Sequence, residues 1–236
     1  FFLWGEELEL PELVNQDLFD GAKGLYPKFH RQFQADILRY ELLEQYGGVW
    51  LDVDFECLRS IESLLAGVEC FAAWDKQDEL INNAILGSVP GRPFVKSLIE
   101  ALPQAVRDNP KAAVWQVSGP RLVTRMAQEW EGKGITVFPE AWFYPVRASQ
   151  LERLDQPHPE AYAVHWWNSL NKNKPARKGQ QYQDLWRDGK CVVKGERTCA
   201  ERYEAIRTLL ERELGRGFSV LDIGGWGGYF TTRLKE

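Results

Sequence analysis

Residues 34–54 read QADILRYELLEQYGGVWLDVD, and this stretch decides the fold. Apolar residues at helical spacing predict a helix over 29–46 that ends at two glycines. Residues 49–54 then predict a short strand, whose alternating side chains place Asp52 and Asp54 on one face, roughly 6.5 Å apart. Two carboxylates that close repel each other unless a cation lies between or beside them. The pattern therefore indicates either a Mg²⁺ or Mn²⁺ site that carries a diphosphate, or a solvated strand exit, where Asp is common.

The composition is that of a globular protein: 44% of the 236 residues are hydrophobic, 27% are charged, and the net charge is −5. This mild acidity gives no support for a nucleic-acid partner. No apolar run reaches the roughly 18 residues of a transmembrane segment, and no signal peptide is visible. The four cysteines form no CxxC pair, and in a chain of this size we expect reduced thiols and a cytoplasmic location.

The rest of the chain alternates predicted strands with predicted helices, which indicates an α/β layer architecture rather than a sandwich or a bundle. The predicted elements after the first strand are a helical turn at 60–65, strands at 70–74, 135–138, 162–167 and 218–223, and helices at 93–107, 118–131 and 196–214. Residues 80–88 form an apolar segment interrupted by two asparagines. Residues 171–181 are polar and broken by Pro and Gly, which predicts a linker. The chain opens without an initiator Met and closes inside a predicted helix, so we interpret it as a piece of a longer protein.

The stretch 34–54 resembles the signature of the DXD-containing, sugar-binding glycosyltransferases of glycosyltransferase family 32, with more distant similarity to the large clostridial glucosylating toxins. The matching residues are Ala35, Asp36, Arg39, Tyr40, Leu43, Gly47, Gly48, Trp50, Asp52 and Asp54. Weaker matches follow at 82–84, 118–120, 143–145 and 163–169. Family members finish the last of these motifs with Ser-Trp, whereas this chain has Ser169-Leu170. The resemblance covers residues 1–172.

This resemblance implies an α/β fold of the GT-A nucleotide-diphospho-sugar transferase type, from which the N-terminal strand is missing. It also implies Mn²⁺ or Mg²⁺ as cofactor, a UDP- or GDP-sugar as donor and a glycan or polysaccharide as acceptor. Transfer would proceed with retention of anomeric configuration. No nucleophile for a double displacement is evident, which favours a front-face displacement in which the metal stabilises the leaving diphosphate.

The same resemblance implies a role for each residue of the stretch. Asp52 and Asp54 are the catalytic pair: Asp54 would ligate the metal directly, and Asp52 would contact the ribose or reach the metal through water. Asp36 and Arg39 would hold the donor sugar. An ordinary i,i+3 ion pair on a helix is the alternative for those two residues. Trp50 would pack either on the nucleotide or in the core.

Two further candidates lie downstream. His165 is a plausible third metal ligand beside the two aspartates, since a neutral imidazole can complete an oxygen-rich site; the alternative is a satisfied core histidine. Asn83 would present its amide to the sugar or the acceptor, with strand-end turn chemistry as the alternative.

The end of the chain resembles a different family. Residues 220–230, VLDIGGWGGYF, resemble motif I of class I S-adenosylmethionine-dependent methyltransferases, in which a glycine turn lets the cofactor approach the backbone. Asp222, Gly224 and Gly228 would be the binding positions of an incomplete site for S-adenosylmethionine (SAM). A dinucleotide-binding turn and a βα turn without a ligand are the alternatives. We therefore expect a transferase domain over 1–178, and over 179–236 a linker and the truncated start of a Rossmann-like methyltransferase domain.

The sequence thus predicts a metal-dependent retaining glycosyltransferase fused to a methyltransferase. Two other functions stay open. The methyltransferase could be the working part beside a decayed transferase region, although Asp36, Arg39, Asp52 and Asp54 are all present. The region could also be a glycan-binding module without catalysis, in which tryptophans stack on sugar rings.

Overall fold

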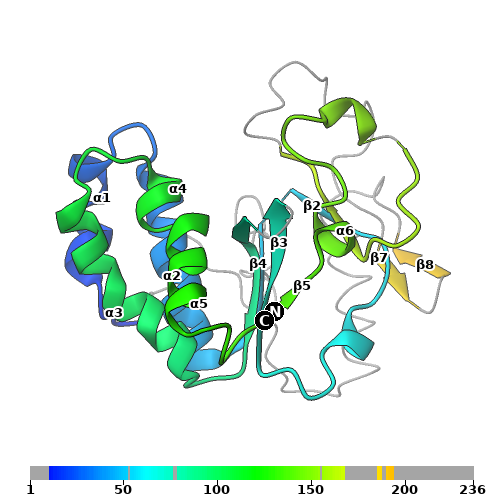
Figure 1. The fold of residues 1–236 in the computed structure, drawn as a ribbon, viewed down its shortest axis with the longest axis horizontal. Helices are drawn as coiled ribbons and strands as arrows, with labels where there is room; N and C mark the ends of the chain where they lie inside the picture. The colour runs from blue at the N-terminus through cyan, green and yellow to red at the C-terminus, as the bar shows by residue number, and fades with distance from the viewer. Residues whose placement is uncertain are drawn as a thin grey trace.

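The computed structural model describes residues 11–52, 54–76, 79–154, 156–167, 185–187 and 190–193. Its elements, in chain order, are α1 (Gln16–Leu25), α2 (His30–Tyr46), β1 (Gly48–Leu51), β2 (Phe55–Cys57), η1 (Glu62–Leu64), β3 (Cys70–Lys76), β4 (Leu80–Ser88), α3 (Pro93–Asp108), α4 (Val114–Val117), α5 (Pro120–Glu129), β5 (Thr136–Phe138), α6 (Glu140–Phe143), η2 (Leu151–Arg153), β6 (Ala163–His165), β7 (Leu185–Arg187) and β8 (Lys190–Val193). The predicted mixed α/β architecture is confirmed (Figure 1).

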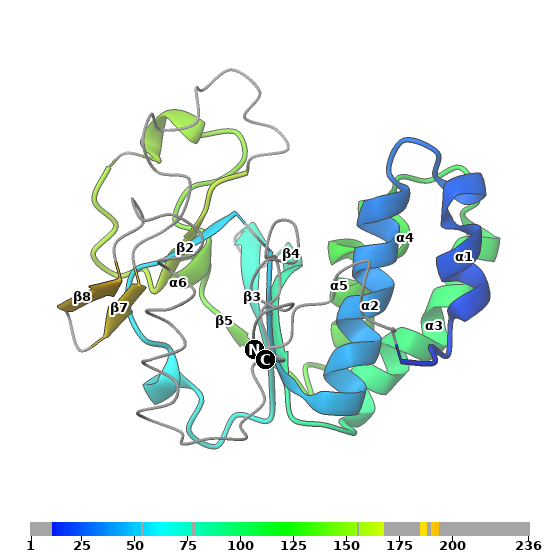
Figure 2. The ribbon, with the colours of Figure 1, turned by 180° about the vertical axis from the view of Figure 1, so that it is seen from behind.

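A four-stranded sheet in the order β1-β4-β3-β5 separates two layers. Its strands pair antiparallel except β3 and β5, which are parallel. Helices α1 to α5 lie on one side of the sheet, and α6 and β2 lie on the other, as Figures 1 and 2 both show. Strand β6 pairs with β2. The chain leaves this sheet after β1 and joins β6 through β2, so the residues between β1 and β2 connect the two sheets.

Successive side chains of a strand point to opposite faces of the sheet, so each layer has its own hydrophobic core. Ala72 and Leu86 pack in the cluster formed with the helices, whereas Phe71, Ala73 and Ile85 pack in the cluster on the opposite face. Strand β4 is buried along almost its whole length, on both faces of the sheet, which explains why its apolar residues do not alternate with exposed polar ones; its asparagines, Asn82 and Asn83, are buried too. The sequence pattern described residues 80–88 as an apolar segment interrupted by two asparagines; the structure makes them an inner strand of the sheet, between β1 and β3.

The helix predicted over 29–46 is confirmed as α2, which ends at Gly47. Gly47 has φ 67° and ψ −163°, a conformation that is essentially restricted to glycine. A Cβ at Gly47 would lie 2.6 Å from Pro90 Cδ and 2.9 Å from the Ser88 carbonyl oxygen. The glycine therefore serves both the turn into β1 and the close approach of the loop after β4.

The predicted strand over 49–54 is too long. Strand β1 ends at Leu51, and the Phe55 N–H donates to the Asp52 carbonyl oxygen at 3.2 Å, which turns the chain out of the sheet. The chain turns here because residues 55–57 form β2, which pairs with β6 instead of continuing beside β4. Asp52 and Asp54 therefore lie on a turn after the strand rather than on one strand face.

Other predictions differ in detail. The helix predicted over 118–131 begins at Pro120, and Ser118 instead ends the separate short helix α4. The helix predicted over 93–107 is confirmed as α3, which runs through Pro103 to Asp108. Helices α1 and α4 were not predicted. The expected helix over 196–214, the strand over 218–223 and the candidate SAM residues Asp222, Gly224 and Gly228 lie outside the described residues.

Glu41 fixes the N-terminal end of α1 against α2. Its side chain is 1% exposed and accepts hydrogen bonds from the N–H groups of Val14 (2.6 Å) and Asn15 (2.8 Å). The Asn15 amide also donates to Glu41, at 3.1 Å. A buried carboxylate with several donors needs no cation, so Glu41 is a structural residue. Within the described residues, no helix combines the length and apolar character needed to cross a bilayer.

Candidate donor and metal site

Helix α2 carries two of the candidate donor-binding residues, Asp36 and Arg39, on a buried face. Asp36 and Arg39 are 6% and 4% exposed. Asp36 accepts hydrogen bonds from Ser118 Oγ at 2.7 Å and from the Asn83 amide at 2.8 Å. The Asn83 amide also lies 3.0 Å from the hydroxyl of Tyr40, one turn along α2 from Asp36. The carboxylate is thus held from α2, β4 and the end of α4 together.

Arg39 connects this carboxylate to the loop after β1. One guanidinium nitrogen lies 3.4 Å from Asp36 and donates to the Asn83 carbonyl oxygen at 2.5 Å; the other donates to Asp52 Oδ1 at 2.8 Å. The guanidinium lies over the Trp50 ring, 5.0 Å from its centroid, and the Trp50 indole N–H donates to the same Asp52 oxygen at 2.9 Å. Arg39 and Trp50 therefore orient Asp52.

Asp54 and His165 meet where β2 and β6 pair. His165 lies opposite Phe55 in the register, and its Nε2 lies 2.9 Å from Asp54 Oδ1. The imidazole ring packs between aromatic rings, with ring centroids 4.7 Å from Phe55 and 4.3 Å from Trp167. The second ring nitrogen, Nδ1, is buried and has no hydrogen-bond partner among the described residues.

Asp52, Asp54 and His165 form a group that fits a divalent cation. One potential ligand atom from each residue lies within 4.8 Å of the others. Two carboxylates and a neutral imidazole are donors that suit Mn²⁺, which accepts both oxygen and nitrogen ligands. The nearby charges also favour a cation, because Arg39 pairs with both Asp36 and Asp52, and Asp54 adds a third carboxylate to the region.

Burial and the neighbouring charges together shift the pKa values of the network. Burial raises the pKa of Asp36, against the opposing effects of Arg39, Ser118 and Asn83. Burial also raises the pKa of Tyr40, and Asp36 raises it further, so this phenol stays protonated. The desolvation of Arg39 lowers its pKa, but Asp52 and Asp36 outweigh this effect and the net pKa is raised. The network therefore holds one permanent positive charge.

The structure brings all seven candidates, Asp36, Arg39, Trp50, Asp52, Asp54, Asn83 and His165, into one connected region. Trp50 is 8% exposed and lies in the core cluster with its N–H bound to Asp52, which is the geometry of the core alternative. Sequence reasoning missed Tyr40 and Ser118 as network members. Both lay in matched motifs, 34–54 and 118–120, and this was the signal that could have identified them.

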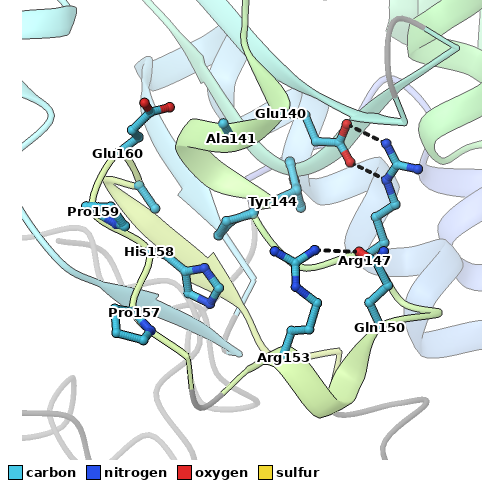
Figure 3. A pocket seen from close by; sticks show the side chains of 12 residues that line it. Glu140, Ala141, Tyr144, Arg147, Gln150, Arg153, Pro157, His158, Pro159 and Glu160 are labelled. Carbon is cyan, nitrogen blue, oxygen red and sulfur yellow. Dashed lines mark hydrogen bonds and ion pairs between the residues drawn. The ribbon is translucent and has the colours of Figure 1, made fainter.

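Tyr144 links this region to a pocket beneath α6. Its ring centroid lies 5.8 Å from that of His165, and its hydroxyl accepts the Ile85 N–H at 3.2 Å. The pocket, of about 550 Å³, is shown in Figure 3; Glu140 and Arg147 form a two-fold ion pair at 2.6 and 3.1 Å in its wall. We call it the α6 pocket.

Comparison with known proteins supports a glycosyltransferase of the DXD-containing type. Residues 1–71 match the model of the "Glycosyltransferase sugar-binding region containing DXD motif", and residues 88–191 match the "Alpha 1,4-glycosyltransferase conserved region". The first match contains Asp36, Arg39, Asp52 and Asp54, and the second contains His165.

Curated relatives are glycosyltransferases by name. Inositol phosphoceramide mannosyltransferase 3 of Schizosaccharomyces pombe is 28% identical over 55% of this chain and 36% of its own length. Human alpha-1,4-N-acetylglucosaminyltransferase is 24% identical over 71% of this chain and 47% of its own. Human lactosylceramide 4-alpha-galactosyltransferase is 23% identical over 70% of this chain and 51% of its own. The chain thus spans about a third to a half of the length of these relatives. Among solved structures, PaToxG glycosyltransferase matches with a TM-score of 0.40 and 17% identity, over 50% of this chain and 44% of its own.

The relatives overturn the predicted cytoplasmic location. Two of the three enzymes above are named for ceramide lipids, which are membrane components, and such relatives are not cytoplasmic enzymes. The prediction rested on reduced cysteines and on the lack of a visible signal or membrane segment. Neither observation locates a chain that covers only part of its relatives.

Proposed function

We propose that this chain carries the donor-binding and metal-binding part of a retaining glycosyltransferase of the GT-A type. It would transfer a sugar from a UDP- or GDP-sugar to a hydroxyl group of a glycan or glycolipid. The carrying observation is the cluster of Asp52, Asp54 and His165 beside the buried Asp36–Arg39–Asn83 network. The family matches and the ceramide-linked names of the relatives support both the reaction class and the choice of acceptor.

Asp54 and His165 would hold Mn²⁺ or Mg²⁺, with Asp52 either as a third ligand or acting through water. When bound, the cation would neutralise the diphosphate as it leaves. The buried, unpartnered Nδ1 of His165 and Nε of Arg39, judged within the described residues, are two polar atoms for which a ligand would supply partners. Arg39 would keep Asp52 oriented, since that carboxylate oxygen already accepts two hydrogen bonds.

The donor sugar would lie against Arg39 and Asn83, with Asp36 behind them. Both oxygens of Asp36 already accept hydrogen bonds from Ser118 and Asn83, so this carboxylate is poorly placed to attack the sugar. That engagement supports front-face displacement, in which the leaving diphosphate oxygen receives the proton of the incoming hydroxyl group. We also propose that the transferase domain ends at residue 178. Residues 179–236 would then be a linker and the start of a methyltransferase domain, which would bind SAM only within a longer protein.

The test measures metal binding and donor turnover in the 236-residue chain. Manganese affinity is read from the electron paramagnetic resonance of free Mn²⁺, and hydrolysis is followed over a panel of UDP- and GDP-sugars. Asp54→Asn is expected to weaken Mn²⁺ binding at least about tenfold and to abolish hydrolysis. Asp17→Asn, at an exposed position in the first turn of α1, is the control and should match the wild type. Wild-type protein that neither binds Mn²⁺ nor turns over any donor would refute the proposal.

A further inference from the structure

A second cleft lies on the helical side of the molecule, away from α6. Helices α3, α4 and α5, seen in Figures 1 and 2, contact one another in pairs. A cleft of about 710 Å³ opens beside them. Its walls include Asn109, Trp115, Gln116, Arg121, Arg125 and Gln128. We call it the α4–α5 cleft. Its volume lies within the range of small-molecule sites in proteins.

Trp115 is the unusual residue of this cleft. It is 49% exposed, whereas every other tryptophan whose side chain the structure describes is buried or partly buried. The exposed indole ring of Trp115 lacks the burial that stabilises most large aromatic residues. Such a ring offers a flat apolar platform, and the C–H face of a pyranose ring is a ligand surface that matches it.

The wall contributed by α5 has the complementary polar character. Arg121, Arg125 and Gln128 are exposed and follow i, i+4, i+7 spacing, so they share one helix face. Their guanidinium and amide groups donate several hydrogen bonds. Glu79, which also lines the cleft, contributes carboxylate acceptors. Sugar hydroxyl groups both donate and accept hydrogen bonds, so a wall that combines donors with acceptors suits a saccharide.

The cleft and the donor site share a turn. Val117 lines the cleft, and the next residue, Ser118, donates to Asp36 at 2.7 Å. Gly119 then brings α5 against α4 so closely that a Cβ on this residue would lie 2.8 Å from the Cα of Trp115. A ligand on Trp115 would therefore sit one turn of chain away from the residue that holds Asp36.

We propose that the α4–α5 cleft binds the saccharide portion of the acceptor, with Trp115 as the stacking platform and the α5 side chains as hydroxyl partners. Identifying this saccharide as the acceptor rests on the proposed glycosyltransferase function. Saccharide binding in the cleft does not itself require the metal site. The α6 pocket is the competing location. Its wall holds the Glu140–Arg147 pair, which is internally satisfied, and among its lining residues there is no tryptophan.

The experiment is ligand-observed saturation-transfer NMR with three free disaccharides: lactose, N-acetyllactosamine and α-1,2-mannobiose. The wild-type chain is expected to bind at least one of them, with the signal retained in EDTA and in Asp54→Asn. Trp115→Ala should raise the dissociation constant at least about tenfold, and Trp115→Phe should restore part of the affinity. Phe29→Ala removes a comparably exposed aromatic residue (55%) from the N-terminus of α2 and should bind as the wild type does.

Each outcome separates the two proposals. Disaccharide binding that depends on Trp115, in a protein that neither binds Mn²⁺ nor hydrolyses any donor, would uphold the cleft as a saccharide site and defeat the transferase. Wild-type affinity in Trp115→Ala, or loss of binding in Arg153→Ala instead, would move the site to the α6 pocket and overturn the inference. Binding of none of the three disaccharides by the wild-type chain would overturn it as well. Circular dichroism of Trp115→Ala and Trp115→Phe establishes that both variants are folded.

Discussion

The guanidinium of Arg39 donates to Asp52 Oδ1 at 2.8 Å, joining the buried face of α2 to the turn after β1. Arg39 is 4% exposed, whereas a third of the Asp52 side chain is exposed. One partner is therefore fixed by the core and the other faces the place where a donor and a cation would bind. Because the core holds Arg39 in place, the ion pair also fixes the position of the partly exposed Asp52 carboxylate.

Replacing this guanidinium should cost both stability and activity. Arg39→Gln leaves the carboxylates of Asp36 and Asp52 without their cation, and removal of one partner from a buried pair costs about 3 kcal/mol. Urea unfolding measures the loss. Lys96→Gln, which removes one side of an exposed i,i+4 pair with Glu100, should cost less than about 1 kcal/mol. Equal losses in the two variants would show that the Arg39 network does not stabilise the fold.

The glycine at the end of α2 should resist substitution. Gly47→Ala places a Cβ 2.6 Å from Pro90 Cδ in a conformation essentially restricted to glycine, so we expect a loss of about 1–3 kcal/mol or more. Gly21 lies inside α1, and a Cβ there would have no other atom within 4 Å. Gly21→Ala should therefore raise stability by about 0.5–1 kcal/mol. Thermal unfolding should show a lower melting temperature for Gly47→Ala and a higher one for Gly21→Ala. A lower melting temperature for Gly21→Ala would contradict this interpretation.

Local sequence signals predicted the parts of this structure that depend on neighbours along the chain. The helix over 29–46 and its glycine stop follow from spacing and backbone conformation, which a short stretch contains. The end of β1 at Leu51 does not, because the turn is dictated by the pairing of β2 with β6. The strand predicted over 162–167 is confirmed as β6, at 163–165, but β2 is only three residues long and was not predicted as a separate strand, so neither was its pairing with β6.

The candidate site shows the same division. Asp36 and Arg39 lie three residues apart on one helix, and Asp52 follows after one turn and one strand, so a single motif predicted their association. His165 lies 111 residues after Asp54 in the sequence, and only family resemblance indicated the pair. The orientation of Trp50 could not be predicted, because it depends on the guanidinium that lies over its ring.

Cys70 should be chemically silent in the folded protein. It is 3% exposed, and burial raises the pKa of its thiol to about 12. A raised thiol pKa stabilises the fold at neutral pH, and the contribution is lost as the pH rises from the usual 9.0 towards 12, because the unfolded chain ionises first. Iodoacetamide at pH 8 should leave Cys70 unmodified until urea is added. Peptide mass spectrometry reads the result, and rapid labelling of the native protein would mean that this strand opens.

Ser118 should prove more important than its size suggests. It is 0% exposed, and its hydroxyl donates to Asp36 Oδ2 at 2.7 Å. Ser118→Ala deprives a buried carboxylate of a donor, which costs about 1–3 kcal/mol. Ser97→Ala removes a hydroxyl whose one hydrogen bond within the described part of the chain is to the Phe94 carbonyl oxygen of α3, and it should cost less than about 1 kcal/mol. In donor hydrolysis, Ser118→Ala should raise the KM for the nucleotide sugar because Asp36 is no longer held behind Asn83. A variant with unchanged stability and unchanged KM would show that Asn83 and Arg39 position this carboxylate without help from the turn between α4 and α5.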